Sequence, residues 1–138
     1  MKSFVDTNVL IYAEDRDAGE RHQIARDLIV ELWNTRTGVV SVQVLQEFFV
    51  NITRKPKKPL SAARALEIVK EYLTWEVVEN SPALLLASIG LHQKAQLSFW
   101  DASVVQAALE ADCSRLYTED LNAGQRFGKL VLENPFKR

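Results

Sequence analysis

Hydrophobic residues along this chain form short groups that alternate between the spacing of a strand and that of a helix. The apolar segment at 2–5 predicts a first strand. Residues 20–34 predict a helix, because Ile24, Leu28 and Leu32 recur every four positions. The chain therefore opens with a strand that is followed by helical sequence.

The same alternation continues to the end of the sequence. Further strands are predicted at 39–40, 75–78, 116–118 and 130–132. Further helices are predicted after Ser41 to about residue 52, after Ser61 to about 73, after Ser81 to about 96, and from Phe99 to about 112. Asn8 is a candidate cap for a short helix directly after the first strand. Strands that alternate with helices favour parallel pairing. The fold class is therefore α/β, a three-layer α/β/α fold with a central, mostly parallel sheet of four to five strands.

Two expectations concern packing. In the helix after Ser61 the apolar stripe is Ala62, Leu66, Val69 and Leu73, and this face is predicted to be buried. The tryptophans, which are Trp33, Trp75 and Trp100, have apolar neighbours and are predicted to pack in the core or in a dimer rather than to stack on bases.

Composition narrows the class of protein. The 138 residues hold 17 Lys and Arg against 18 Asp and Glu, a net charge of −1, which argues against a nucleic-acid partner held by overall charge. No apolar run is long enough to span a membrane. One cysteine, Cys113, excludes an internal disulfide and fits a reducing cytoplasm. Without repeats or linkers, residues 1–138 are expected to form a single domain.

Acidic residues follow the predicted strands. Asp6 and Asp120 come after strands whose carboxyl ends face the usual ligand crevice of a parallel sheet. Asp101 opens a helix and shares its buried face with Val104 and Val105. Each of these acids could instead cap a helix, with Trp100 and Val105 forming a staple around an Asp101 cap.

If these acids converge, their charges repel by roughly 4 kcal/mol per pair at about 4 Å. A cluster would then need protonation or a hard divalent cation, and all-oxygen ligands favour Mg²⁺ or Mn²⁺. Glu47 lies off the apolar arc of its helix, so the pattern alone predicts a solvated side chain.

Four segments in chain order resemble one known family. They are Phe4-Val5-Asp6-Thr7-Asn8-Val9-Leu10, Gln46-Glu47-Phe48-Phe49, Ser98-Phe99-Trp100-Asp101-Ala102 and Tyr117-Thr118-Glu119-Asp120-Leu121. Together they resemble the acidic motifs of PIN-domain ribonucleases, most of all the toxin of a type II virulence-associated (VapBC-type) toxin–antitoxin pair. This resemblance implies a PIN-like fold, Mg²⁺- or Mn²⁺-dependent RNA cleavage, a homodimer and a cognate antitoxin.

The resemblance also implies roles for individual residues. The acidic catalytic and metal-binding set would be Asp6, Glu47, Asp101 and Asp120, with Thr7, Asn8 and Thr118 as polar support. For Glu119 two interpretations stay open, a solvated neighbour or a spare ligand that substitutes for another acid.

One dense basic run could offset the acidic site. It consists of Arg54, Lys55, Lys57 and Lys58, interrupted by prolines. Such a run is either a solvated loop or a contact for RNA phosphates.

Other functions fit the same residues less well. A haloacid-dehalogenase-type phosphohydrolase needs an acid two residues after its nucleophile, where this chain has Asn8, and a receiver domain needs an early acidic pair that is not clear here. A non-catalytic PIN-like module that binds RNA or protein would gain nothing from mutually repelling acids. A structure-specific DNA nuclease remains the other alternative.

Overall fold

A computed structural model describes residues 1–137. One six-stranded sheet lies at the centre of the protein. Its strands are β1 (Ser3–Val5), β2 (Gly38–Ser41), β3 (Glu76–Val78), β4 (Arg115–Tyr117), β5 (Arg126–Phe127) and β6 (Leu130–Glu133), in the order β3-β2-β1-β4-β6-β5. Only β5 runs antiparallel to its neighbour. The mostly parallel sheet is confirmed, with β5 as the short strand that the sequence pattern did not predict.

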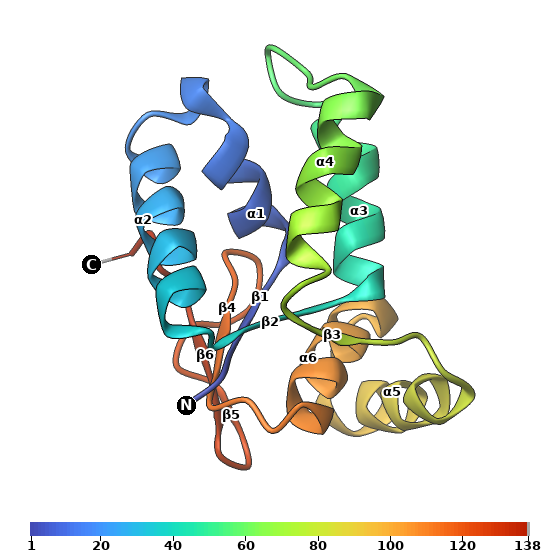
Figure 1. The fold of residues 1–138 in the computed structure, drawn as a ribbon. Helices are drawn as coiled ribbons and strands as arrows, with labels where there is room; N and C mark the ends of the chain where they lie inside the picture. The colour runs from blue at the N-terminus through green and yellow to red at the C-terminus, as the bar shows by residue number, and fades with distance from the viewer. Residues whose placement is uncertain (138) are drawn as a thin grey trace.

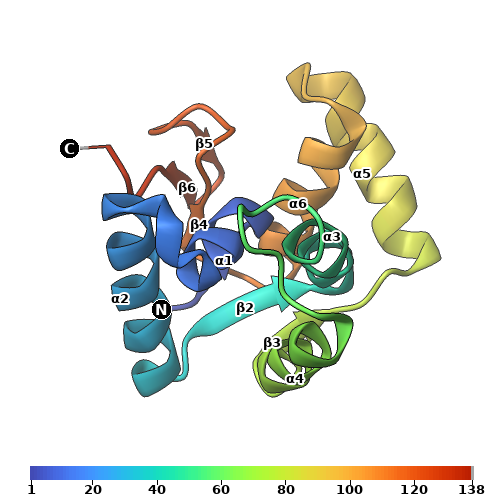
Figure 2. The ribbon, with the colours of Figure 1, turned by 90° about the horizontal axis from the view of Figure 1, so that it is seen from above.

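Helices cover both faces of this sheet. They are α1 (Thr7–Glu14), the short 3₁₀ helix η1 (Arg16–Ala18), α2 (Glu20–Thr35), α3 (Val42–Ile52), α4 (Ala62–Tyr72), α5 (Pro82–Ala95) and α6 (Phe99–Glu110). In both views α1 and α2 lie on one side of the sheet and α5 and α6 on the other, while α3 and α4 form a pair beside α1 (Figures 1 and 2). The α/β/α layering is thus confirmed. Within residues 1–137 no helix is both long and apolar enough to cross a membrane.

The central strands are buried on both faces, as expected when helices cover a parallel sheet. Phe4 and Val5 of β1 and Leu116 of β4 have no exposed surface. The strand β2, which lies between β3 and β1, begins at Gly38, where a Cβ atom would lie 2.5 Å from the Trp75 ring. Only glycine therefore allows this indole to pack against the start of β2.

Serine caps set the start of four helices. The hydroxyls of Ser41, Ser61, Ser81 and Ser98 each accept a hydrogen bond from the amide three residues further along, at 3.0–3.2 Å. The predicted caps Ser41, Ser61 and Ser81 are confirmed. The proposed Asp101 cap is wrong, because Ser98 takes that place. The Asn8 cap is also wrong, because Asp6 caps α1.

The predicted buried face of α4 is wrong as well. The side chains that pack inward are Ala65, Ile68 and Tyr72. Leu66 and Leu73, from the predicted stripe, are 49% and 52% exposed. Two apolar faces occur on this helix, and the one that carries the large aromatic ring of Tyr72 faces the core.

Candidate active site at the carboxyl ends of the strands

Asp6 lies where β1 ends, and its backbone and side chain are both held in place. Its amide donates to the carbonyl of Tyr117 at 3.0 Å, which extends the pairing of β1 with β4. Its Oδ1 accepts from the amide of Thr7 at 2.7 Å, and its Oδ2 accepts from the hydroxyl of Thr118 at 2.8 Å. The carboxylate is therefore oriented by the first residue of α1 and by the residue after β4, while only 8% of Asp6 is exposed.

Burial raises the pKa of Asp6 from 3.8 to about 6. Hydrogen bonds from Thr118 and Thr7 lower the pKa, whereas the charges of Asp120 and Glu47 raise it further. At neutral pH Asp6 is thus ionised in a poorly hydrated position with two other acids nearby. A cation at this position would offset both the cost of burying the Asp6 charge and its repulsion by the other two acids.

The other predicted acids approach Asp6 from different elements. Glu47 on α3 accepts from the Thr7 hydroxyl at 3.2 Å. Asp120 follows β4, and its amide donates to the Thr118 hydroxyl at 3.2 Å. Because Ser98 caps α6, the Asp101 carboxylate is not used as a cap. Thr118 therefore connects Asp6 to the loop that carries Asp120.

These four acids line one hollow of about 270 Å³. The other residues that line it are Thr7, Asn8, Ile11, Gln43, Asn51, Lys55, Trp100 and Val104. The structure thus brings together every acid of the predicted set, including Glu47, whose helical phase alone predicted a solvated side chain.

The oxygen atoms in this hollow are of the kind that binds a hard divalent cation. They are carboxylate and amide oxygens, the ligands that Mg²⁺ prefers. Both polar atoms of the Asn8 side chain are buried and have no hydrogen-bond partner within residues 1–137. In the same part of the chain no group of three or more His, Cys, Asp or Glu residues is arranged to hold a metal ion as it stands. The acids would therefore have to draw together around a cation.

Glu119 lies outside the hollow. Its carboxylate accepts from the Tyr12 hydroxyl at 2.9 Å and from Arg21 Nε at 2.7 Å. Arg21 also lies over the Tyr12 ring, 5.9 Å from its centroid. Glu119 therefore links the loop after β4 to α1 and α2 and is not simply solvated, and its role as a spare ligand stays a prediction.

The basic run divides in two. Lys55 lines the acidic hollow, whereas Arg54, Lys57 and Lys58 are exposed on the loop after α3 and do not line it. The structure therefore brings one of the four predicted RNA contacts to the acids.

The sequence analysis did not assign five of the lining residues to the site, the apolar Ile11 and Val104 and the polar or aromatic Gln43, Asn51 and Trp100. Gln43 and Asn51 are one helical turn before and after Glu47, so these positions form a polar stripe along α3. That i, i+4, i+8 spacing is a signal that could have identified them.

The prediction that Trp100 packs in the core is wrong, whereas the alternative, packing in a dimer, stays a prediction. Trp100 is 63% exposed. Trp33 and Trp75 do pack as predicted, with ring centroids 5.1 Å apart and both close to Tyr72.

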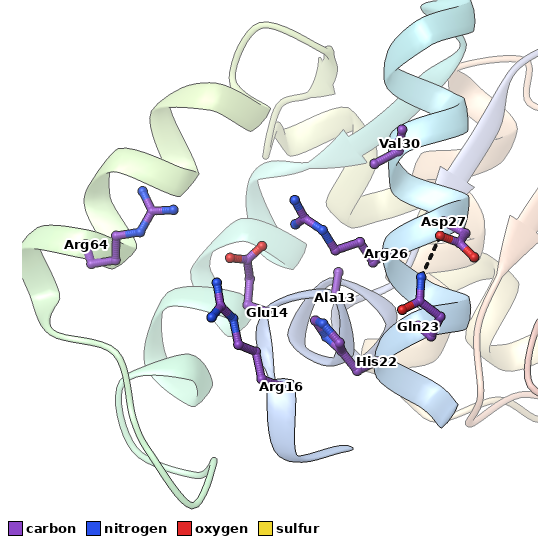
Figure 3. A pocket seen from close by; sticks show the side chains of 9 residues that line it. All are labelled: Ala13, Glu14, Arg16, His22, Gln23, Arg26, Asp27, Val30 and Arg64. Atoms are coloured by element: carbon purple, nitrogen blue, oxygen red, sulfur yellow. Dashed lines mark hydrogen bonds between the residues drawn. The ribbon is translucent and has the colours of Figure 1, made fainter. Parts of the chain in front are cut away.

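A second hollow lies at the opposite end of α1. It has a volume of about 530 Å³, and Arg26 on α2 and Arg64 on α4 extend toward the space above Glu14 (Figure 3). Burial raises the pKa of Glu14, and the two guanidinium groups oppose that rise. This hollow combines mainly basic groups, in contrast to the acidic hollow at the start of α1.

Comparisons with known proteins agree with this architecture. The sequence profile of the PIN domain matches residues 3–126. Over 86 residues the chain is 31% identical to Ribonuclease VapC24 of Mycobacterium tuberculosis, a match that spans 58% of each protein.

Solved structures share the fold at low sequence identity. A toxin–antitoxin complex from Klebsiella pneumoniae is 19% identical with a TM-score of 0.71, covering 99% of this chain and 100% of that one. VapBC2 from Rickettsia felis, bound to a promoter DNA fragment, is 20% identical with a TM-score of 0.68, covering 97% and 98%. The sarcin-ricin-loop-cleaving toxin VapC20 of M. tuberculosis is 21% identical with a TM-score of 0.64, covering 86% and 90%. With the profile matched over most of its length and the four acids at one sheet edge, the chain belongs to the PIN domain family.

Proposed function

We propose that this chain is a Mg²⁺- or Mn²⁺-dependent endoribonuclease that hydrolyses RNA phosphodiester bonds as the toxin of a toxin–antitoxin pair. The observation that carries the proposal is the convergence of Asp6, Glu47, Asp101 and Asp120 on one hollow that Lys55 also lines. The 31% identity to a protein named as a ribonuclease supports the same reaction class.

Each side chain has a role in this proposal. A bound divalent cation would orient the phosphate, activate water and stabilise the leaving oxygen. Asp6 and Asp101 would hold the cation, and Glu47 and Asp120 would complete its ligands or orient water. Thr118 would keep Asp6 in position through its hydrogen bond to Oδ2.

Phosphate binding needs positive charge close to these acids. Lys55 supplies it at the rim of the hollow, and the exposed Arg54, Lys57 and Lys58 extend the basic surface along the neighbouring loop. The scissile phosphate would thus lie between the acids with their cation and Lys55.

Incubation of the purified protein with labelled RNA and DNA separates the alternatives. We expect RNA cleavage with Mg²⁺ or Mn²⁺, none with EDTA, and a loss of at least about 100-fold in Asp101→Asn. Glu110→Gln, which alters an exposed acid at the other end of α6, serves as the matched control and should cleave normally. Binding without cleavage would favour the non-catalytic module, and cleavage of DNA alone would favour the DNA nuclease.

The partners are also part of the proposal. Exposed apolar side chains line one groove of α3 and α4, among them Val50, Leu66 and Leu73 at 46%, 49% and 52% exposure. Clustered apolar surface of this kind is typical of protein interfaces. We propose a homodimer and a cognate antitoxin as the proteins that cover it, and a cytoplasmic location. Co-expression with the adjacent reading frame, followed by co-purification, tests the antitoxin.

A further inference from the structure

We infer that the groove between α5, α6 and α3, beside Trp100, binds an unpaired nucleobase that stacks on the Trp100 indole next to the scissile phosphate. This inference rests on the proposed function, because it names how that same site holds its substrate. Neither the family match nor the predicted acidic set assigns a role to this groove.

The groove is continuous with the acidic hollow. It has a volume of about 510 Å³, within the range of ligand pockets. Trp100 and Gln43 line both the groove and the hollow of the four acids. A nucleic-acid strand whose phosphate lies at the acids therefore places an adjacent nucleotide beside Trp100.

The indole of Trp100 is presented to solvent in a defined position. The residue is 63% exposed, although it lies in the first turn of a helix whose next turn is buried. The ring of Phe99 meets the Trp100 ring edge-to-face at a centroid distance of 5.1 Å and an angle of 73°. Exposed aromatic rings beside a phosphate site are the usual platform on which single-stranded bases stack.

The groove is mainly apolar, with Leu84, Leu85 and Phe99 in its lining, and side-chain amides lie among these apolar groups. Gln43, Gln46 and Asn80 contribute side-chain amides, which both donate and accept hydrogen bonds. Asn80 Nδ2 and Gln46 Oε1 are 3.5 Å apart, a long contact that leaves both groups able to bond a ligand. Such amides match the edges of bases, whereas an apolar helix would leave them unpaired.

The groove and the acidic hollow differ in charge. Among the described residues that line the groove none is charged, whereas the adjoining hollow has the acids and Lys55. Ser88 at the groove is fully buried, and its hydroxyl has no partner within residues 1–137. An uncharged, mainly apolar groove with one unsatisfied buried hydroxyl suits a neutral aromatic ring better than a phosphate.

Binding of three labelled octamers by the full chain tests this inference. The probes are adenosine and uridine octamers and an abasic octamer with the same backbone, measured by fluorescence anisotropy with Ca²⁺ while gels verify that the probes stay intact. We expect Trp100→Ala to weaken binding of the adenosine octamer by about 5- to 100-fold and to leave the abasic octamer unchanged. Trp100→Phe should retain most of the affinity, because it keeps an aromatic face.

The matched control is Leu86→Ala, which removes an equally exposed apolar side chain outside the groove. It should bind all probes like the wild type. Three outcomes overturn the inference: equal weakening of the abasic probe by Trp100→Ala, no weakening of any probe, or no binding of the base-containing octamers by the wild type. A change of molecular mass in Trp100→Ala, measured by light scattering, would also overturn it and assign the groove to a protein contact.

The inference and the proposed function can fail separately. Metal-dependent RNA cleavage that is indifferent to Trp100 would retain the function and remove the base site. Trp100-dependent binding without cleavage in Mg²⁺ or Mn²⁺ would retain the base site and remove the nuclease. The wild-type comparison of base-containing and abasic octamers needs no variant, so a folding defect cannot obscure the result.

Discussion

The proposed role of Asp6 requires its carboxyl group to be ionised. In the absence of a cation, this buried charge destabilises the folded protein. Its pKa is raised to about 6 because the carboxylate is buried near two other acids. The native chain therefore holds a proton up to about pH 6 that the unfolded chain releases near pH 4. Between these pH values the native state binds more protons, so the free energy of unfolding falls as the pH rises. Above about pH 6 the free energy of unfolding has lost the whole contribution of this proton.

We predict that Asp6→Asn abolishes RNA cleavage while it stabilises the protein at pH 7. An amide removes the buried charge, and the shift in pKa corresponds to about 1–3 kcal/mol. The gain should disappear near pH 4, where the wild-type carboxyl is protonated as well. Urea unfolding at pH 4 and pH 7 measures it, and an equal difference at both pH values would contradict this explanation.

A second prediction concerns Thr118, which positions Asp6 without lining the hollow. Thr118→Val keeps the shape but removes the donor to Asp6 Oδ2. Because that hydrogen bond lowers the pKa of Asp6, the low-pH limb of cleavage should move to higher pH. The unpaired carboxylate should also destabilise the fold by about 1–3 kcal/mol.

Thr118→Ser is the control, since it retains the hydroxyl. It should restore the pH profile of cleavage even if loss of the methyl group lowers stability. A valine variant with an unshifted pH profile would show that Thr118 acts only on folding.

At the scale of elements, α4 shows what periodicity leaves undetermined. Leu66 and Leu73 form one apolar stripe, whereas Ala65, Ile68 and Tyr72 form another that is offset by one position. A helical pattern identifies faces but not which of two faces a sheet or a neighbouring helix will cover. The packing of Tyr72 against Trp33, 5.3 Å between centroids, is a tertiary fact that no local pattern contains.

We therefore predict unequal costs for two similar truncations on α4. Ile68→Ala should destabilise the protein by about 2–5 kcal/mol, because Ile68 is 3% exposed. Leu66→Ala should change the stability of the monomer by less than about 0.5 kcal/mol, because half of that residue is exposed. Equal losses in urea unfolding would place the core on the wrong face of α4.

The candidate site was predictable to the extent that it depends on strand ends. Asp6 and Asp120 follow β1 and β4, which are hydrogen-bonded neighbours, so sheet topology brings them together. Glu47 lies on α3, and its place followed only from the resemblance, because its approach depends on how α3 packs against α1. The exposure of Trp100 depends on how the first turn of α6 packs against the rest of the protein, which the sequence pattern does not define.

The whole molecule separates its charges although they almost cancel. Four acids share one hollow, while Arg16, Arg26 and Arg64 line another and Lys57 and Lys58 are exposed beside Lys55. The net charge of −1 thus conceals two opposed local fields. A polyanion would approach over the basic surfaces and meet the acids only where a cation offsets them.

We predict that the loop lysines contribute to RNA binding by neutralising phosphates. Lys57→Ala with Lys58→Ala should reduce the slope of log affinity against log salt by about 0.7 for each phosphate that is no longer neutralised. Lys94→Ala, an exposed lysine on α5, is the control and should leave the slope unchanged. An unchanged slope in the double variant would remove this loop from the RNA surface.

The apolar groove of α3 and α4 carries a prediction about assembly. It is about 480 Å³ in volume and is lined by Leu66, Leu73 and Phe49, among others. If a second copy covers it, Leu66→Asp with Leu73→Asp should convert the dimer to a monomer in light scattering without loss of fold. Leu86→Asp, outside this groove, should leave the mass unchanged, and a double variant that stays dimeric would place the dimer interface elsewhere.

The hydrogen bond between Asp6 and Thr118 joins residues that are 112 positions apart in the chain. During synthesis the ribosome makes Asp6 well before β4, one of the two strands that pair with β1, and before the Thr118 hydroxyl that orients the carboxylate. A nascent chain that stalls before Thr118 therefore has an unsupported acid and an incomplete sheet. Under the proposed function, an interrupted copy would be harmless to the cell that makes it, and nuclease activity would arise only once translation has passed β4.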